Sequence, residues 1–128
     1  MKFRGVATAL VCVLSAGVGQ AQDCGHSVTG VPEEIKGILS PAYAGEADLQ
    51  AIAKQMNVLM LEAAHCQAAA QSIIGRSRES EAEIVEWHSL NQWLYRLTNF
   101  VNLNANGDNS IDWRDEFKVF AEVYELAL

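Results

Sequence analysis

The sequence has few basic side chains and no apolar run long enough to cross a membrane. The apolar stretch from Val6 to Leu14 ends well short of the roughly 18 residues that a spanning helix requires, and no later stretch reaches that length. Nine Lys and Arg residues stand against 16 Asp and Glu residues. Because no apolar run is long enough, we expect no membrane span. Because binding to phosphate backbones needs a basic surface, we expect no nucleic-acid partner either.

Recognisable catalytic motifs are missing as well. The sequence has no GxSxG, HExxH or CxxCH, and its three histidines, His26, His65 and His88, are scattered. The best acid–base pair that the helices could form is His88 with Glu62. A histidine beside an apolar helix seam is more often a partly buried polar side chain than a catalyst. The sequence therefore predicts that the protein is not an enzyme.

The amino terminus has the pattern of a secretory signal peptide. Lys2 and Arg4 precede the apolar stretch, and small residues follow it up to Ala21, after which we expect cleavage. The protein would then be periplasmic or secreted, with residues 22–128 forming one small domain. Since Lys2 and Arg4 are two of the nine basic residues, the mature chain would carry seven basic and 16 acidic side chains, a net charge of −9. Such a charge suits a basic protein surface or a cation.

Apolar periodicity predicts an all-α fold, since no strand-like alternation occurs and the apolar side chains recur at spacings of three and four. We expect a small antiparallel bundle of three main helices plus a short N-terminal helix. The short helix covers residues 31–39 and is broken by residues 40–45. The main helices cover residues 46–74, residues 80–103 after a capping box that begins at Ser80, and residues from Asp112 onward. The expected core positions are Leu49, Ile52, Met56, Leu59, Ala63, Cys66, Ala70, Ile73, Trp87, Leu90, Leu94, Leu97, Val101, Trp113, Phe117, Phe120 and Tyr124.

Two cysteines, Cys24 and Cys66, remain after cleavage. In an oxidising compartment an even pair usually forms a disulfide, which here would tie the amino terminus to the first long helix. His26 and His65 lie close to the cysteines in the sequence, so a metal site is the other interpretation. Zinc ligands usually come in tighter local pairs, which favours the disulfide.

A polar loop between two helical runs lies in the stretch from Phe100 to Phe117, FVNLNANGDNSIDWRDEF. It resembles the calcium loop of an EF-hand. The resemblance implies that Ca²⁺ is held by the side chains of Asn104, Asn106 and Asp108, the backbone carbonyl of Ser110, and the carboxylates of Asp112 and Asp115.

The loop departs from the EF-hand pattern at three positions. Asn104 replaces the first Asp, Asn109 stands where Gly is usual, and the closing carboxylate is Asp115 instead of Glu. A loop longer by one residue would make Glu116 the closing ligand. We expect Asp115 to ligate, with Glu116 turned to solvent. Alternatively, the loop is only a turn in which Asp112 caps the following helix.

Two functional hypotheses follow from these patterns. The first is an exported helical protein that binds another protein, such as an immunity protein or an inhibitor. The aromatic stripe that includes Trp93 and Phe100 exceeds what one buried face requires, so these two residues are the expected partner contacts. The second is an EF-hand-like protein in which the ion orders the last two helices.

Overall fold

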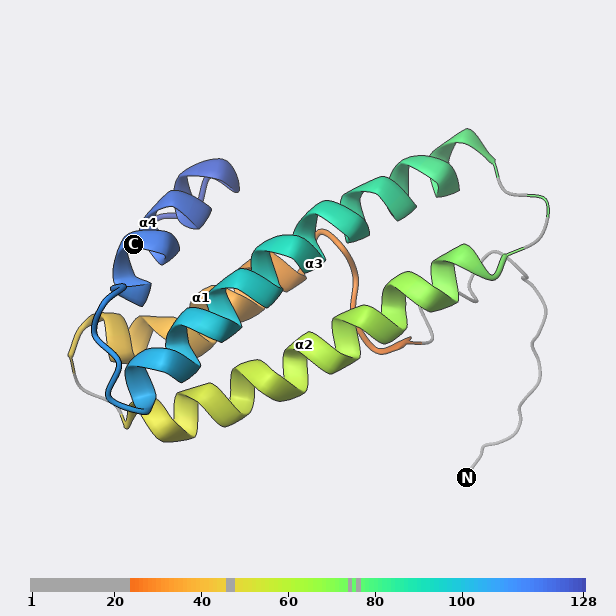
Figure 1. The fold of residues 1–128 in the computed structure, drawn as a ribbon. Helices are drawn as coiled ribbons and strands as arrows, with labels where there is room; N and C mark the ends of the chain where they lie inside the picture. Colours follow the sequence, from red (N-terminus) through yellow and green to blue (C-terminus); the bar gives the residue numbers. More distant parts are fainter. Residues whose placement is uncertain (1–23, 46–47, 74, 76) are drawn as a thin grey trace, which may run out of the picture.

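The computed structural model describes residues 24–45, 48–73, 75 and 77–128 (Figure 1). The expected signal peptide, residues 1–21, lies outside the described residues. No described helix combines the length and the apolar character that crossing a membrane requires. The described residues form four helices and no strand: α1 (Val31–Tyr43), α2 (Leu49–Gln71), α3 (Arg78–Ala105) and α4 (Trp113–Val123).

The two longest helices, α2 and α3, run antiparallel along most of the molecule, as Figure 1 shows. Helix α1 packs against α2, and α4 packs against α3 near the end of the bundle where the α3–α4 loop lies. The all-α prediction and the packing of the long helices as a bundle are confirmed. Helix α1 has 13 residues and α4 has 11, so the amino-terminal helix is the longer of the two short ones.

The core lies along the predicted apolar seams. Every expected core position is buried except Leu49, Ile73 and Tyr124, which are partly buried and pack against the core. Spacings of three and four place these side chains on one stripe of each helix, so their apolar surface leaves water together. The largest fully buried side chains are aromatic or aliphatic and come from all four helices; they include Trp87, Trp113, Phe117, Phe120, Ile35 and Met56.

Helix α1 does not end where we expected. It continues through Pro41 to Tyr43 instead of breaking after residue 39. Proline at this position removes one helical hydrogen bond. Tertiary packing of the last turn compensates for that loss, because Ala42 is buried and the ring of Tyr43 makes edge contacts with Trp113 and Phe117, at centroid distances of 6.4 and 5.5 Å.

The start of α3 also differs from the prediction. The capping box is formed by Ser77 and Ser80, so the helix begins at Arg78 instead of near residue 80. Glu83, which would close a capping box begun by Ser80, instead accepts a hydrogen bond from the indole N–H of Trp87, at 3.3 Å. Two overlapping capping patterns occur in the sequence, and the helix begins with the earlier one.

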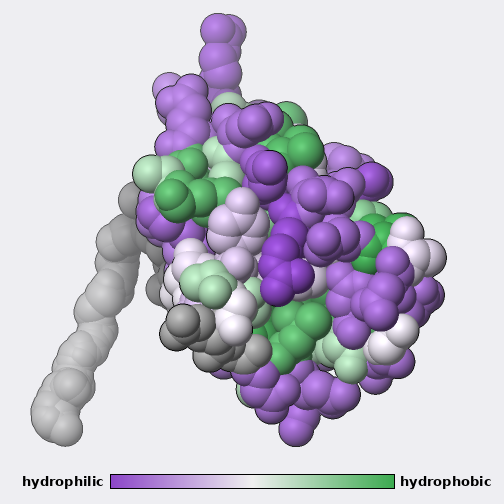
Figure 2. All heavy atoms as spheres, turned by 90° about the vertical axis from the view of Figure 1, so that its left-hand side faces the viewer, coloured by the Kyte–Doolittle hydropathy of each residue, from purple (hydrophilic) through white to green (hydrophobic). Residues whose placement is uncertain are grey.

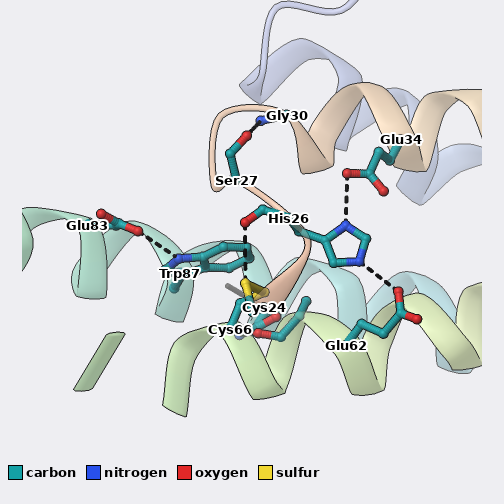
Figure 3. The surroundings of a disulfide bond; sticks show 11 residues. Cys24, His26, Ser27, Gly30, Glu34, Glu62, Cys66, Glu83 and Trp87 are labelled. Carbon is teal, nitrogen blue, oxygen red and sulfur yellow. Dashed lines mark hydrogen bonds and ion pairs between the residues drawn. A yellow bond between two sulfur atoms is a disulfide. The ribbon is translucent and has the colours of Figure 1, made fainter. Parts of the chain in front are cut away.

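A disulfide joins Cys24 to Cys66, with a sulfur–sulfur distance of 2.03 Å, as predicted (Figure 3). Cys66 lies on the buried face of α2, and Cys24 lies in the segment that precedes α1. The bond therefore fixes the beginning of the described chain against the middle of the bundle. It also excludes the metal interpretation that used both thiolates.

Candidate functional site

Asn104 organises the loop between α3 and α4. Its side-chain N–H groups donate to the carbonyl oxygens of Asp108, at 2.7 Å, and Ile111, at 2.5 Å. Its side-chain oxygen accepts from the backbone N–H of Trp113, at 2.8 Å. One amide thus satisfies three backbone groups that the loop and the start of α4 leave without a helical partner.

Three other predicted calcium ligands, Asn106, Asp108 and Asp112, have side chains that bond to protein groups. The carboxylate of Asp108 accepts from the backbone N–H and the hydroxyl of Ser110, and the backbone bond lowers the pKa of Asp108 below its ordinary value of 3.8. The side chain of Asn106 donates to the carbonyl of Asn102. Asp112 caps α4 by accepting from the N–H of Arg114, as one of our two interpretations required.

The two candidate closing residues have different surroundings. Asp115 is exposed in the first turn of α4. Glu116 does not point to solvent as we expected: its carboxylate bonds to the guanidinium of Arg96 on α3 at 2.6 and 3.3 Å, and its side chain is only 21% exposed. This pair could not be predicted from the sequence, because its members lie 20 positions apart on different helices.

No three His, Cys, Asp or Glu side chains of the described residues gather closely enough to hold a metal ion. An EF-hand-like loop also uses amide and backbone oxygens, so its calcium binding stays a prediction. A fixed positive charge lies beside the loop, where a guanidinium nitrogen of Arg114 is 3.8 Å from the carboxylate of Asp112. A cation bound at Asp112 would have to displace this guanidinium or bind against its repulsion.

Trp93 and Phe100, the predicted partner contacts, line one cleft between α3 and α4, which we call the aromatic cleft. Its volume is about 810 Å³. The ring of Trp93 meets Phe120 edge-on at 5.8 Å, and the guanidinium of Arg96 lies over Phe100 at 5.2 Å. The remaining lining residues are Ser89, Gln92, Tyr95, Asn99, Glu116 and Val119.

The described histidines do not form the acid–base pair that we considered. Glu62 bonds to Nε2 of His26, at 2.7 Å, while Nε2 of His88 accepts from the side-chain amide of Gln92, at 3.2 Å. Nδ1 of His26 bonds to Glu34 of α1, at 3.0 Å, so the imidazole bridges α1 and α2 beside the disulfide (Figure 3). The hydrogen bond to Glu34 raises the pKa of His26 above its ordinary value of 6.5.

Comparison of the chain with protein-family models, with curated proteins and with solved structures finds no match. Any functional proposal must therefore rest on the chemistry of the aromatic cleft and of the α3–α4 loop.

Proposed function

We propose that the chain is an exported helical protein that binds another protein, of the immunity or inhibitor type, and that the aromatic cleft is part of its contact surface. The observation that supports this proposal is that Trp93 and Phe100 line one solvent-open cleft together with Arg96 and Tyr95. Tyr95 is 60% exposed. Trp, Tyr, Phe and Arg are the residue types enriched at the centres of protein interfaces, where they supply most of the binding energy.

The charge of the chain indicates the kind of partner. With 16 acidic residues against nine basic ones, the protein attracts basic surfaces and repels acidic ones. The surface seen from the α3–α4 loop end agrees with a soluble binding module, because hydrophilic side chains cover most of it and hydrophobic ones form separate patches (Figure 2). A basic protein, such as a cationic toxin or enzyme in the same compartment, suits this surface.

The test compares variants of the cleft with a variant elsewhere. Immobilised mature protein is used to capture its partner from a periplasmic extract, and the affinity of the identified partner is then measured by calorimetry. Tyr95→Ala and Phe100→Ala should each weaken binding about tenfold or more. Leu61→Ala, which alters an exposed apolar side chain on α2, is the matched control and should change it less than about twofold. Equal affinities of all three variants would contradict the proposal, as would a chain that retains no protein.

We propose as the second candidate that the α3–α4 loop binds Ca²⁺ weakly and so orders α4 relative to α3. It is supported by the side-chain oxygens of Asn104, in the last turn of α3, and of Asp108 and Asp112, in the loop that follows. An unpaired loop with two or three carboxylates corresponds to a dissociation constant of about 0.1 to 1 mM.

Calorimetric titration with Ca²⁺ tests the second candidate. Wild-type protein should release or take up heat, and Asp108→Ala should abolish it. If Asp115 closes the loop, Asp115→Ala should abolish binding while Glu116→Ala leaves it intact, although the loss of the Arg96 ion pair should change the stability of Glu116→Ala. Heat that is absent in the wild type, or the same in Asp108→Ala, would leave the loop as a turn alone.

A further inference from the structure

A second cleft, distinct from the aromatic one, lies where the start of α1, the middle of α3 and the residues after α4 meet. Its volume is about 490 Å³. Val28, Pro32, Leu90 and Leu126 give it an apolar lining, and Pro32 and Leu90 are buried there. We call it the acidic cleft, because its charged groups are all of one sign.

Three carboxylates from three different segments line the acidic cleft. Glu33 comes from the first turn of α1, Glu86 from α3 and Glu125 from the residue after the cap of α4. No Lys, Arg or His is among the residues that line it. Within the part of the chain that the structure describes, none of the three belongs to an ion pair. Among the described residues, none of these carboxylates therefore has a basic side chain within ion-pair distance.

The charge of Glu86 acts on Tyr124, the aromatic side chain beside it in the cleft. Burial raises the pKa of Tyr124, and the negative charge of Glu86 raises it further. Burial alone disfavours a charge of either sign, whereas the charge of Glu86 disfavours a further negative charge in the cleft and favours a positive one. The three carboxylates are not close enough together to hold a metal ion, since no metal-holding group occurs among the described residues.

The combination of an apolar lining and an acidic rim matches the side chain of lysine or arginine. Such a side chain buries its methylene stem against apolar surface while its charged head stays near carboxylates and water. A purely apolar ligand would bring the carboxylates no compensating charge, and an anionic lipid would be repelled. We propose that the acidic cleft receives a lysine or arginine side chain from a basic, partly apolar segment of a partner polypeptide.

The inference rests on the proposed function for the identity of the partner, and the two clefts form one surface. Ser89 lines both of them. Glu86, Trp93 and Phe100 follow one another at intervals of seven residues on α3. They therefore lie on the same face of the helix, each about 10 Å from the next. One partner segment can place a basic side chain at Glu86 and apolar side chains at Trp93 and Phe100.

The experiment uses a synthetic probe, so that it does not depend on finding the natural partner. A fluorescent 14-residue amphipathic peptide of lysine and leucine is titrated into the mature protein, and binding is followed by anisotropy. The comparison peptide has every lysine acetylated, which keeps the stems and removes the charge. The cleft variant carries Glu33→Gln, Glu86→Gln and Glu125→Gln. The matched control carries Asp48→Asn, Glu79→Gln and Glu122→Gln, which change the net charge equally but lie outside the cleft.

We expect the cleft variant to bind the lysine peptide about tenfold more weakly than wild type, and the control variant to bind it within about twofold. The acetylated peptide should bind all three proteins weakly. Equal losses in the two variants would show attraction by net charge alone, and tight binding of the acetylated peptide would show an apolar groove. Either result overturns the inference. It is also overturned if the wild-type protein self-associates and the cleft variant does not.

The outcomes also separate this inference from the proposed function. If Phe100→Ala weakens the natural partner but the cleft variant does not, the protein-binding function holds and the acidic cleft has no part in it. If the cleft variant alone weakens both the peptide and the natural partner, the contact surface lies at the acidic cleft. Circular-dichroism melting of every variant checks that each is folded.

Discussion

Glu125 occupies a backbone conformation that suits glycine. Its φ of +57° is the one positive value at a non-glycine residue among those that the structure describes. It follows the α4 cap residue Tyr124, and the N–H of Leu126 bonds to the carbonyl of Ala121, at 2.8 Å, which closes the helix end. A side chain at this left-handed position costs about 1 kcal/mol.

Glu125→Gly should therefore raise the free energy of unfolding by about 0.5 to 1 kcal/mol, as measured by urea denaturation. The control is Glu122→Gly, the same substitution inside α4, which should lower it by a similar amount. The acidic-cleft proposal adds that Glu125→Gly binds the lysine peptide more weakly although it is more stable. A loss of stability would mean that the carboxylate, and not the backbone, governs this position.

His26 makes stability depend on pH through two carboxylates. A carboxylate only accepts hydrogen bonds, so both ring nitrogens must be protonated for His26 to donate to Glu34 and Glu62 together. The pKa of His26 in the folded protein is accordingly raised above 6.5, the value in the unfolded chain. The stabilisation is fully present below the unfolded pKa and is lost as the pH rises through the folded one.

Wild-type protein should thus gain more stability than His26→Gln when the pH falls from about 8 to about 6. Chemical denaturation at several pH values measures this difference. His65→Gln, which changes an exposed histidine, should keep the wild-type profile. Parallel profiles of wild type and His26→Gln would show that the bridge contributes nothing in solution.

At the scale of the elements, Asn104 joins α3 to α4. Asn104→Ala removes its bonds to Asp108, Ile111 and Trp113 and should lower the free energy of unfolding by about 1 to 2 kcal/mol. The control is Asn109→Ala in the same exposed loop, which should change it by less than about 0.5 kcal/mol. Urea denaturation compares the two. Equal effects would mean that water replaces the bonds of the amide without cost.

The helices also show which structural features could be predicted from the sequence. Met56 and Leu94 could be placed in the core because apolar spacing along one helix reports the buried face directly. Asp112 could be placed as a cap because capping is a local event. The end of α1 could not be predicted, because the contacts of Tyr43 with α4 that hold it come from residues far along the chain.

The candidate site shows the same division. Trp93 and Phe100 were recognisable as an excess aromatic stripe, and they do line one cleft. The ion pair of Arg96 with Glu116 and the meeting of Glu33, Glu86 and Glu125 depend on how separate helices pack. Periodicity within one helix carries no information about which charges of other helices come near, so these features required the fold.

For the whole molecule, the disulfide connects the stability of the bundle to the acidic cleft. Cys24 precedes Val28 and Pro32, which line that cleft, and its bond to Cys66 closes a loop with a sequence separation of 42. Without the bond, the unfolded chain gains the conformational entropy of that loop, which lowers the free energy of unfolding by about 4 kcal/mol. The aromatic cleft is formed by α3 and α4 and contains no residue of the segment that the disulfide anchors.

The Cys24→Ser/Cys66→Ala variant should therefore melt at a lower temperature, and lose affinity for the lysine peptide more than for a partner held at Phe100. Thiol counting under denaturing conditions should find no free thiol in the mature wild-type protein. Two free thiols would mean that the bond does not form during export. Equal losses of affinity at the two clefts would mean that the disulfide stabilises the bundle as a unit. A loss of affinity at the acidic cleft alone identifies the segment before α1 as the part that the bond holds in place.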